Sequence, residues 1–218
     1  MTVRLAVFDC DGTLSDGQAA VVNAMGAAFA EVGLPAPQAQ SVRRIVGLSL
    51  PNAVRQLVPD AAPDQVSATV AAYKAAFFAA REAGSVHEPL FAGMHDLLHR
   101  LHGAGWVLGV ATGKSDRGLT STLAVHGLAG LFATTHTADR HPSKPHPAML
   151  AAAMADALAQ PADTVMIGDT VFDIDMARAA GVRAVGVAWG YHEPHELLRA
   201  GAVGVAETMQ ELEEMIHG

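Results

Sequence analysis

Two short acidic motifs, each placed directly after an apolar run, constrain the fold of this chain more than any other feature. The run Val3–Phe8 leads into DCDGTL at 9–14, and the run Thr164–Ile167 leads into GDTVFD at 168–173. Short runs of this kind, rich in β-branched residues, are typical of buried parallel strands. The carboxyl ends of parallel strands share one edge of a sheet, which is where ligands bind in open α/β folds. We therefore expect both sets of carboxylates at one ligand-binding edge.

The rest of the chain divides into a purely helical segment and a segment in which helices and strands alternate. Residues 17–84 carry apolar residues at helical spacing and no strand pattern. Beyond them, strands are expected at Val107–Ala111, Leu131–Thr135 and Arg183–Ala188, with helices between. Such alternation predicts an α/β fold, a parallel sheet covered by helices on both faces. We predict a core of residues 1–15 and 86–218 and an inserted helical cap at 16–85. The chain passes between core and cap at two crossings, near residues 15–17 and 84–88, where glycines allow hinge motion.

The predicted edge gathers four carboxylates, those of Asp9, Asp11, Asp169 and Asp173. Like charges about 4 Å apart repel by roughly 4 kcal/mol per pair at an effective dielectric constant of about 20. A hard cation with oxygen ligands removes this cost, and Mg2+ is the usual choice where phosphate is also handled. The motifs therefore predict a metal-dependent enzyme with Mg2+ as its cofactor.

Asp9, at the tip of the first strand, is the predicted nucleophile. A carboxylate can attack phosphorus and form an aspartyl-phosphate, which divides one difficult step into two easier ones. Asp11 lies where it can protonate the leaving oxygen and later deprotonate water. Gly12 permits a tight turn that brings backbone N–H groups close to a phosphate. Taken alone, the motif is equally consistent with a surface Asp-Gly turn after a strand.

Two further positions favour phosphate chemistry over that alternative. Thr112 and Gly113 follow the strand Val107–Ala111 at the same edge, where a hydroxyl and a free backbone N–H suit a phosphate oxygen. Lys144 supplies a positive charge ahead of the next helix. Phosphoryl transfer spreads negative charge over three equatorial oxygens, so catalysis is mainly positioning and electrostatics. The chain thus offers a nucleophile, an acid, a hydroxyl, a lysine and a metal site.

In this order along the chain, the motifs resemble those of the haloacid dehalogenase superfamily of phosphohydrolases. They are DxDGTL at 9–14, Thr112, Lys144 before Pro145, and GDxxxD at 168–173. The resemblance covers the whole chain and implies a Rossmann-like core with a helical cap inserted after the first motif. In relatives the Lys-Pro peptide bond is often cis, which suggests the same for Lys144–Pro145.

The same resemblance implies two sets of site residues. The implied Mg2+ ligands are the side chains of Asp9 and Asp169 and the backbone carbonyl of Asp11. Asp173 assists in binding the metal. The phosphate site is made by Gly12, Thr13, Thr112, Gly113 and Lys144.

Three details narrow the expected activity within that superfamily. Dehalogenases lack the second aspartate of the first motif, so Asp11 favours phosphate chemistry. Sugar phosphomutases tend to carry Val or Ile where Thr13 stands and a His in the linker that follows, whereas here residues 15–18 read SDGQ. Residues 188–191 and 196–202 are similar to phosphoglycolate phosphatase-like members of subfamily I. We predict a Mg2+-dependent phosphatase acting through an aspartyl-phosphate, with 2-phosphoglycolate as the best single substrate.

Other readings stay open at this stage. The same scaffold serves pyrophosphate or nucleotide hydrolysis and phosphomutase chemistry. A non-enzymatic receiver domain, phosphorylated on aspartate, shares the acid cluster, but the helical insertion and the DGT turn count against it. A phosphate-binding protein without catalytic activity is a further alternative, but such a protein would not need every site residue. Specificity is expected from cap side chains, with one of Arg43, Arg44, Arg55 and Lys74 a candidate for a second anionic group on the substrate.

Composition limits the partners of the chain. The net charge is −8, the pI is about 5.7, and no basic run occurs, so nucleic-acid binding is not expected. Cys10 is the only cysteine and the first apolar run is too short for a signal peptide, so a cytoplasmic protein is expected. No stretch has the length of a membrane span. We expect a monomer or homodimer whose partner is a small phosphorylated metabolite.

Overall fold

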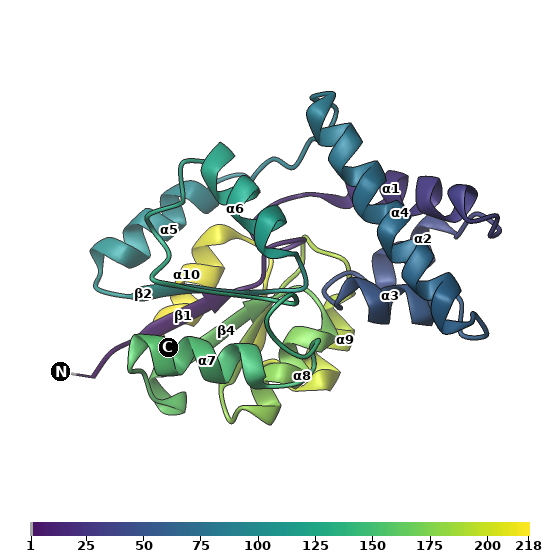
Figure 1. The fold of residues 1–218 in the computed structure, drawn as a ribbon. Coiled ribbons are helices and arrows are strands. Elements are labelled where there is room, and N and C mark those ends of the chain that lie inside the picture. The colour runs from purple at the N-terminus through teal and green to yellow at the C-terminus, as the bar shows by residue number, and fades with distance from the viewer. Residues whose placement is uncertain (1) are drawn as a thin grey trace.

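The computed structural model describes residues 2–218. Within them the strands form a six-stranded sheet in the order β3-β2-β1-β4-β5-β6, and every neighbouring pair is parallel (Figure 1). The strands are β1 (Leu5–Phe8), β2 (Val107–Thr112), β3 (Thr134–Thr137), β4 (Thr164–Gly168), β5 (Arg183–Val187) and β6 (Gly204–Ala206). The α/β class and the parallel sheet predicted from the sequence are confirmed.

Side chains alternate between the two faces of this sheet, and each face carries its own apolar cluster. From β1, Ala6 and Phe8 pack in the cluster that includes α5, α6 and α10, whereas Leu5 and Val7 pack in the cluster that includes α7, α8 and α9. The molecule therefore has three layers, helices over sheet over helices (Figure 1). The helices are α5 (Met94–Gly103), α6 (Asp116–Val125), α7 (Ala148–Ala157), α8 (Val171–Ala179), α9 (Pro194–Ala200) and α10 (Met209–His217).

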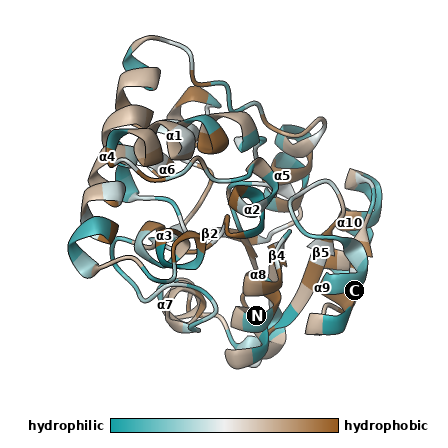
Figure 2. Cartoon of the chain, turned by 90° about the vertical axis from the view of Figure 1, so that its right-hand side faces the viewer, coloured by the Kyte–Doolittle hydropathy of each residue, from teal (hydrophilic) through white to brown (hydrophobic). Residues whose placement is uncertain are grey.

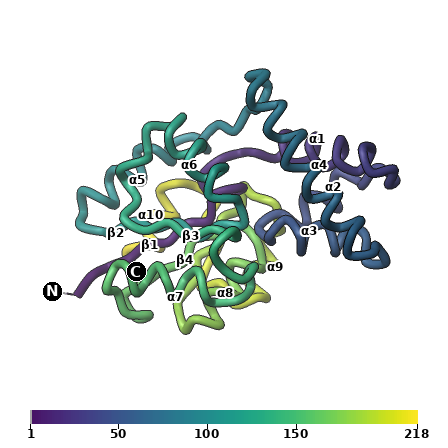
Figure 3. Tube along the Cα trace, in the orientation of Figure 1, coloured from purple at the N-terminus to yellow at the C-terminus, as the bar shows by residue number. Residues whose placement is uncertain are grey.

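The remaining helices lie beyond the carboxyl ends of the strands. They are α1 (Gln18–Glu31), α2 (Ala39–Arg44), α3 (Leu50–Leu57) and α4 (Pro63–Glu82). They share a third apolar cluster, built around residues such as Met25, Phe29 and Val54, to which Tyr191 of the core also belongs. Figure 3 shows the chain leaving β1 towards α1 and returning from α4 towards α5. The two crossings run side by side, since Asp16 N–H donates to the Pro89 carbonyl at 2.8 Å.

The hydropathy of the chain matches these layers. Figure 2 shows hydrophobic residues along strands such as β5 and hydrophilic residues on the outer turns of helices such as α10. None of the helices in residues 2–218 combines the length and the apolar character that a membrane crossing requires.

Several element boundaries differ from the sequence prediction, and two of the differences have a clear physical cause. The strand expected at Leu131–Thr135 lies at Thr134–Thr137, because the apolar residues before it, among them Phe132, fill the core from a turn rather than from the sheet. Helix α8 begins at Val171, two residues before the expected Asp173. There Thr170 and Asp173 form a capping box that starts the helix earlier.

Candidate active site

Strand order places the predicted site residues together. Because β1 lies between β2 and β4, the carboxyl ends of these three strands are adjacent. Asp9 follows β1, Thr112 is the last residue of β2, and Asp169 follows β4. The backbone continues the sheet here, since Asp9 N–H donates to the Ile167 carbonyl at 2.9 Å.

Three carboxylates meet at this edge. One oxygen each from Asp9, Asp169 and Asp173 lies within 4.8 Å of the others, and all three residues are fully buried. The pKa of Asp9 is raised to about 7, because burial and the nearby charge of Asp173 raise it by more than Lys144 lowers it. Burial also raises the pKa of Asp169, together with the charges of Asp9 and Asp173. The cluster therefore holds its negative charge at a cost that a bound cation would remove.

Asp169 is held in place by neighbours from both ends of the chain. The Thr13 hydroxyl donates to Oδ1 at 2.8 Å, and the Tyr191 backbone N–H donates to Oδ2 at 2.9 Å. Two glycines make room for it: a Cβ on Gly12 would lie 2.2 Å from Asp169 Oδ2, and one on Gly190 would lie 2.1 Å from Asp169 Cβ. The first of these also has a φ of +87°, so the turn itself favours glycine.

Asp173 and Lys144 form a buried ion pair beside Asp9. Lys144 Nζ lies 2.6 Å from Asp173 Oδ1 and 2.8 Å from Asp9 Oδ1. Asp173 Oδ2 accepts from the hydroxyl and N–H of Thr170 at the start of α8. Burial alone would lower the pKa of Lys144, but the charges of Asp173 and Asp9 outweigh it and raise that pKa. The Lys144–Pro145 peptide bond is cis, as the resemblance suggested.

The donor set fits a divalent cation. Both carboxylate oxygens of Asp9 are buried, and no donor in residues 2–218 makes a hydrogen bond of normal geometry to them. When all three are ionised, the carboxylates leave two negative charges in excess of the one Lys144 ammonium, which is the charge that the raised pKa values of Asp9 and Asp169 oppose. Oxygen ligands, unsatisfied acceptors and that charge balance are the chemistry that Mg2+ requires.

Asp11 does not join the carboxylate cluster. We expected four converging carboxylates, but the side chain of Asp11 points to Lys114, whose Nζ lies 2.7 Å from its Oδ1. The turn at 10–15 turns the chain away from the sheet, with Leu14 and Ser15 N–H both bonded to the Cys10 carbonyl. The predicted metal contact of Asp11 through its backbone carbonyl is a separate matter and stays a prediction.

The residues predicted to bind phosphate lie around the same edge. The Thr112 hydroxyl accepts from the Lys114 N–H at 3.2 Å. A Cβ on Gly113 would lie 2.6 Å from the carbonyls of Gly47 and Leu48, so this loop lies against the connection between α2 and α3. The donors of the first motif are used internally: Gly12 N–H bonds the Ser15 carbonyl, and the Thr13 hydroxyl bonds Asp169.

A cavity of about 550 Å3 opens over these strand ends, between the core and helices α1 to α4. Its core side includes Asp9, Asp11, Thr112 and Gly113. Its other side, formed by the helical segment, is mostly apolar and aromatic, with two cations: Val21, Met25, Ile45, Val46, Leu48, Leu50, Tyr73, Lys74, Phe77, Phe78 and Arg81. Of the four cap cations that the sequence suggested, only Lys74 lines this cavity. A bound molecule would thus touch the predicted nucleophile at one end and helix α4 at the other.

Sequence reasoning missed three parts of the site. Lys114 belongs to none of the motifs above, and the stretch 109–115 around it has only three residues between its glycines, where a nucleotide-binding P-loop needs four. Glu88 lies in the linker that leads back from α4 and shares the Lys114 ammonium at 2.7 Å. Tyr191 reaches the site through its backbone, which no side-chain motif reveals. Cys10, by contrast, is buried in the core as its alternation with Asp9 predicts.

Comparisons with known proteins agree with this fold. The family model described as haloacid dehalogenase-like hydrolase matches residues 6–187, and the chain belongs to this family. A probable phosphatase, IndB of Dickeya dadantii, is 35% identical over 98% of this chain and 93% of its own length. A phosphoglycolate phosphatase of Vibrio vulnificus is 27% identical over 98% of this chain and 96% of its own length.

The fold itself also recurs among solved structures. The crystal structure of a predicted phosphoglycolate phosphatase from Haemophilus somnus superposes with a TM-score of 0.86, at 21% identity, over 99% of this chain and 98% of the other. The chain is therefore an enzyme with the haloacid dehalogenase hydrolase fold, and its subfamily is phosphoglycolate phosphatase-like.

Proposed function

We propose that the chain is a Mg2+-dependent phosphatase that hydrolyses a small phosphomonoester through an aspartyl-phosphate. The observation that carries this proposal is Asp9, a buried carboxylate that lines a cavity, whose Oδ1 faces the Lys144 ammonium at 2.8 Å and whose Oδ2 has no hydrogen-bond partner in residues 2–218. One oxygen can attack phosphorus while the other serves a cation. Similarity to phosphatases supports the reaction class.

Each neighbour of Asp9 receives a role in this proposal. Lys144 and Thr112, with the N–H of Gly113, bind and orient the phosphoryl oxygens. Asp11 gives a proton to the leaving oxygen and later removes one from water, since its carboxylate lies outside the acid cluster and lines the cavity. Mg2+, held by Asp9, Asp169, Asp173 and the Asp11 carbonyl, would neutralise the charge of the phosphate when bound.

The helical segment 16–85 is proposed to act as a cap over this site, with the core formed by 1–15 and 86–218. Its own apolar cluster and its paired crossings support movement as a unit. Closure would exclude water and bring the aromatic side of α4 against the leaving group. Arg44 ties it to the core here, with two bonds of 2.6 and 2.7 Å to Glu196.

We propose 2-phosphoglycolate as the first substrate to test, on the strength of the relatives with that activity in their names. Its carboxylate needs a cation on the cap side of the cavity. Lys74 of α4 lines the cavity, and no ion pair to it occurs within residues 2–218. Pyrophosphate, nucleotide or sugar-phosphate chemistry is the alternative on the same site.

The cellular setting is part of the same proposal. A single, buried cysteine fits a reducing compartment, so we place the enzyme in the cytoplasm. We propose a monomer or homodimer, which light scattering at several concentrations distinguishes.

The experiment is phosphate release from a panel of phosphorylated metabolites, measured with Mg2+ and with chelator. We expect chelator-sensitive release from 2-phosphoglycolate, abolished in Asp9→Asn although that variant keeps the fold. Release from another compound alone would keep the mechanism and change the substrate. Substantial turnover by Asp9→Asn would refute the nucleophile, and an isomer in place of free phosphate would indicate a mutase.

A further inference from the structure

A chain of four alternating charges connects the proposed acid to the cap. Lys114 Nζ lies 2.7 Å from Asp11 Oδ1 and 2.7 Å from Glu88 Oε1, and Arg81 Nη2 lies 2.7 Å from Glu88 Oε2. The side chains of Asp11, Glu88 and Lys114 are each 7–11% exposed, so water reaches them little. Two negative and two positive charges balance within the chain, which is what burial of such groups requires.

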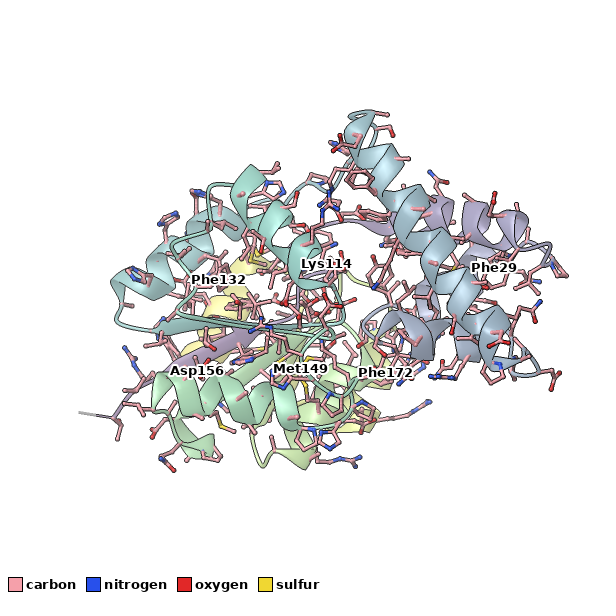
Figure 4. The ribbon with its side chains drawn as sticks, viewed as in Figure 1. Phe29, Lys114, Phe132, Met149, Asp156 and Phe172 are labelled. Carbon is pink, nitrogen blue, oxygen red and sulfur yellow. The ribbon has the colours of Figure 1, made fainter. Side chains whose placement is uncertain are left out.

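The four residues belong to three parts of the molecule. Asp11 and Lys114 follow β1 and β2 in the core, and Arg81 lies in the last turn of α4. Glu88 lies in the returning linker, whose backbone is fixed to the core because His126 Nε2 bonds the Glu88 carbonyl at 2.8 Å. Figure 4 shows Lys114 at the junction between the core and α4. The Arg81–Glu88 pair therefore spans the hinge itself.

Other neighbours leave this chain little freedom. The ring centroid of Phe77 on α4 lies 5.4 Å from the Arg81 guanidinium and 5.9 Å from Lys114 Nζ. On the other side, a Cβ added to Gly17 would lie 3.0 Å from Asp11 Oδ1 and 3.3 Å from Glu88 Oε1. The two segments that connect core and cap therefore both restrict the positions of the Asp11 and Glu88 carboxylates.

We propose that Lys114 and Glu88 are positioning residues for Asp11. Through the Arg81–Glu88 pair, the way in which they hold the Asp11 carboxylate depends on the position of the cap. Lys114 fixes the Asp11 carboxylate on the cavity side of the turn, and Glu88 fixes Lys114. When α4 moves away, Glu88 loses Arg81 and Lys114 loses the cover of Phe77, so Asp11 is held in place only with the cap closed. This inference rests on the proposed role of Asp11 as the acid.

Leaving groups separate this role from simple structural damage. An alkyl phosphate such as ethyl phosphate needs a proton on its leaving oxygen, whereas 4-nitrophenyl phosphate needs one far less. For Lys114→Met we expect kcat/KM to fall about 100-fold with ethyl phosphate, the size expected for a misplaced catalytic group. With 4-nitrophenyl phosphate the loss should stay below about 5-fold, and Lys114→Arg should recover part of the larger loss.

A double-mutant cycle with Asp11→Ala completes the test. If Lys114 acts through Asp11, adding Lys114→Met to Asp11→Ala should cost little more with ethyl phosphate. Arg81→Met and Gly17→Ala should shift the ratio between the two esters in the same direction as Lys114→Met, but less. Arg100→Met, which breaks a 2.7 Å pair with Glu213 between α5 and α10, should not shift it.

The outcomes distinguish this inference from the proposed function. Equal losses with both esters, or full additivity with Asp11→Ala, would overturn the positioning role while leaving the phosphatase proposal intact. Wild-type kcat/KM in Asp11→Ala would remove the acid itself and the inference with it. Lys114→Met leaves the two carboxylates of Asp11 and Glu88 against the one Arg81 cation. If that variant does not fold because of this excess negative charge, Lys114→Met with Glu88→Gln removes the excess and is measured in the same way.

Discussion

The Thr13 hydroxyl donates a 2.8 Å hydrogen bond to Oδ1 of Asp169, which lies 156 residues further along the chain. This bond joins the first acidic motif to the last. The other oxygen of Asp169, Oδ2, accepts a hydrogen bond from the Tyr191 N–H. Because both oxygens have a donor, the orientation of the carboxylate is determined before any cation binds. Groups that orient a metal ligand in this way typically influence affinity as strongly as some ligands do.

Thr13→Val tests this relationship. It keeps the shape of the side chain and removes only the donor, so Asp169 Oδ1 loses its partner. We expect the Mg2+ concentration for half-maximal activity to rise about 10- to 100-fold, the range seen for lost outer partners of metal ligands. Titration calorimetry with Mg2+ gives the same comparison without substrate. Thr122→Val, which removes a hydrogen bond to a helix carbonyl in α6, is the matched control. Equal Mg2+ affinity in Thr13→Val and in this control would contradict the prediction.

The sequence was sufficient to predict the sheet, the three clustered aspartates and Lys144, because each depends on local order along the chain. A strand followed at once by a polar motif places its residues at one edge, whatever the details of packing. The position of Asp11 could not be derived in the same way. Its side chain follows the turn at 10–15, whose direction depends on backbone bonds that no spacing rule gives.

Glu88 and Arg81 show a second limit. Neither belongs to a motif. Glu88 contacts Lys114, and Arg81 contacts Glu88, only because the fold brings three separated segments together. Tyr191 contributes its backbone N–H, which is invisible in residue identity. Pairings of this kind depend on how segments far apart in the sequence pack against one another, and the spacing of residues in a single sequence does not give that packing.

Gly190→Ala should damage the acid cluster through packing alone. The new Cβ would lie 2.1 Å from Asp169 Cβ, far inside van der Waals contact, so one of the two segments must shift. We expect a loss of about 1–3 kcal/mol in the free energy of unfolding, as for other overpacked sites, together with weaker Mg2+ activation. Urea denaturation measures the first quantity.

The control for that variant is Gly26→Ala in the interior of α1, where a Cβ meets no atom of residues 2–218 within 4 Å. That change should stabilise the protein by about 0.5–1 kcal/mol, because alanine favours a helix over glycine. Equal effects of both substitutions would show that close contact at Gly190 is not what excludes a side chain there.

Lys74→Met tests whether the substrate carries a second anionic group. Lys74 lines the cavity on the side of α4, opposite the predicted nucleophile. If it binds the carboxylate of 2-phosphoglycolate, the preference for this compound over ethyl phosphate should fall about 10-fold, since a charge-assisted hydrogen bond contributes roughly 1.5–3 kcal/mol. Arg55→Met, at an exposed cap arginine bonded to Asn52, should leave the preference as it is. An unchanged preference in Lys74→Met would favour a leaving group without that charge.

Because of the Arg44–Glu196 ion pair between α2 and α9, the free energy of unfolding should depend on pH in the acidic range. The pKa of Glu196 is lowered from 4.5 to about 2, mainly by the hydrogen bonds from Arg44 and next by the backbone N–H of Glu193. A carboxyl group whose folded pKa is depressed stabilises the folded state above its unfolded pKa and loses that contribution as the pH falls. The contribution is therefore complete above about pH 5 and is lost between about pH 4.5 and pH 2.

Arg44→Met isolates this effect. Because the Arg44 side chain is 42% exposed, solvent screening keeps the pair near the range of surface ion pairs, and we expect a loss of about 0.5–1 kcal/mol at pH 7. The difference from the wild type should shrink to nothing as the pH approaches 2, whereas Arg178→Met, at a pair within α8, should show a smaller loss at pH 7. Urea denaturation of the three proteins from pH 7 down to pH 2 measures both trends. A difference that persists at pH 2 would assign the loss to the packing of the arginine stem rather than to its charge.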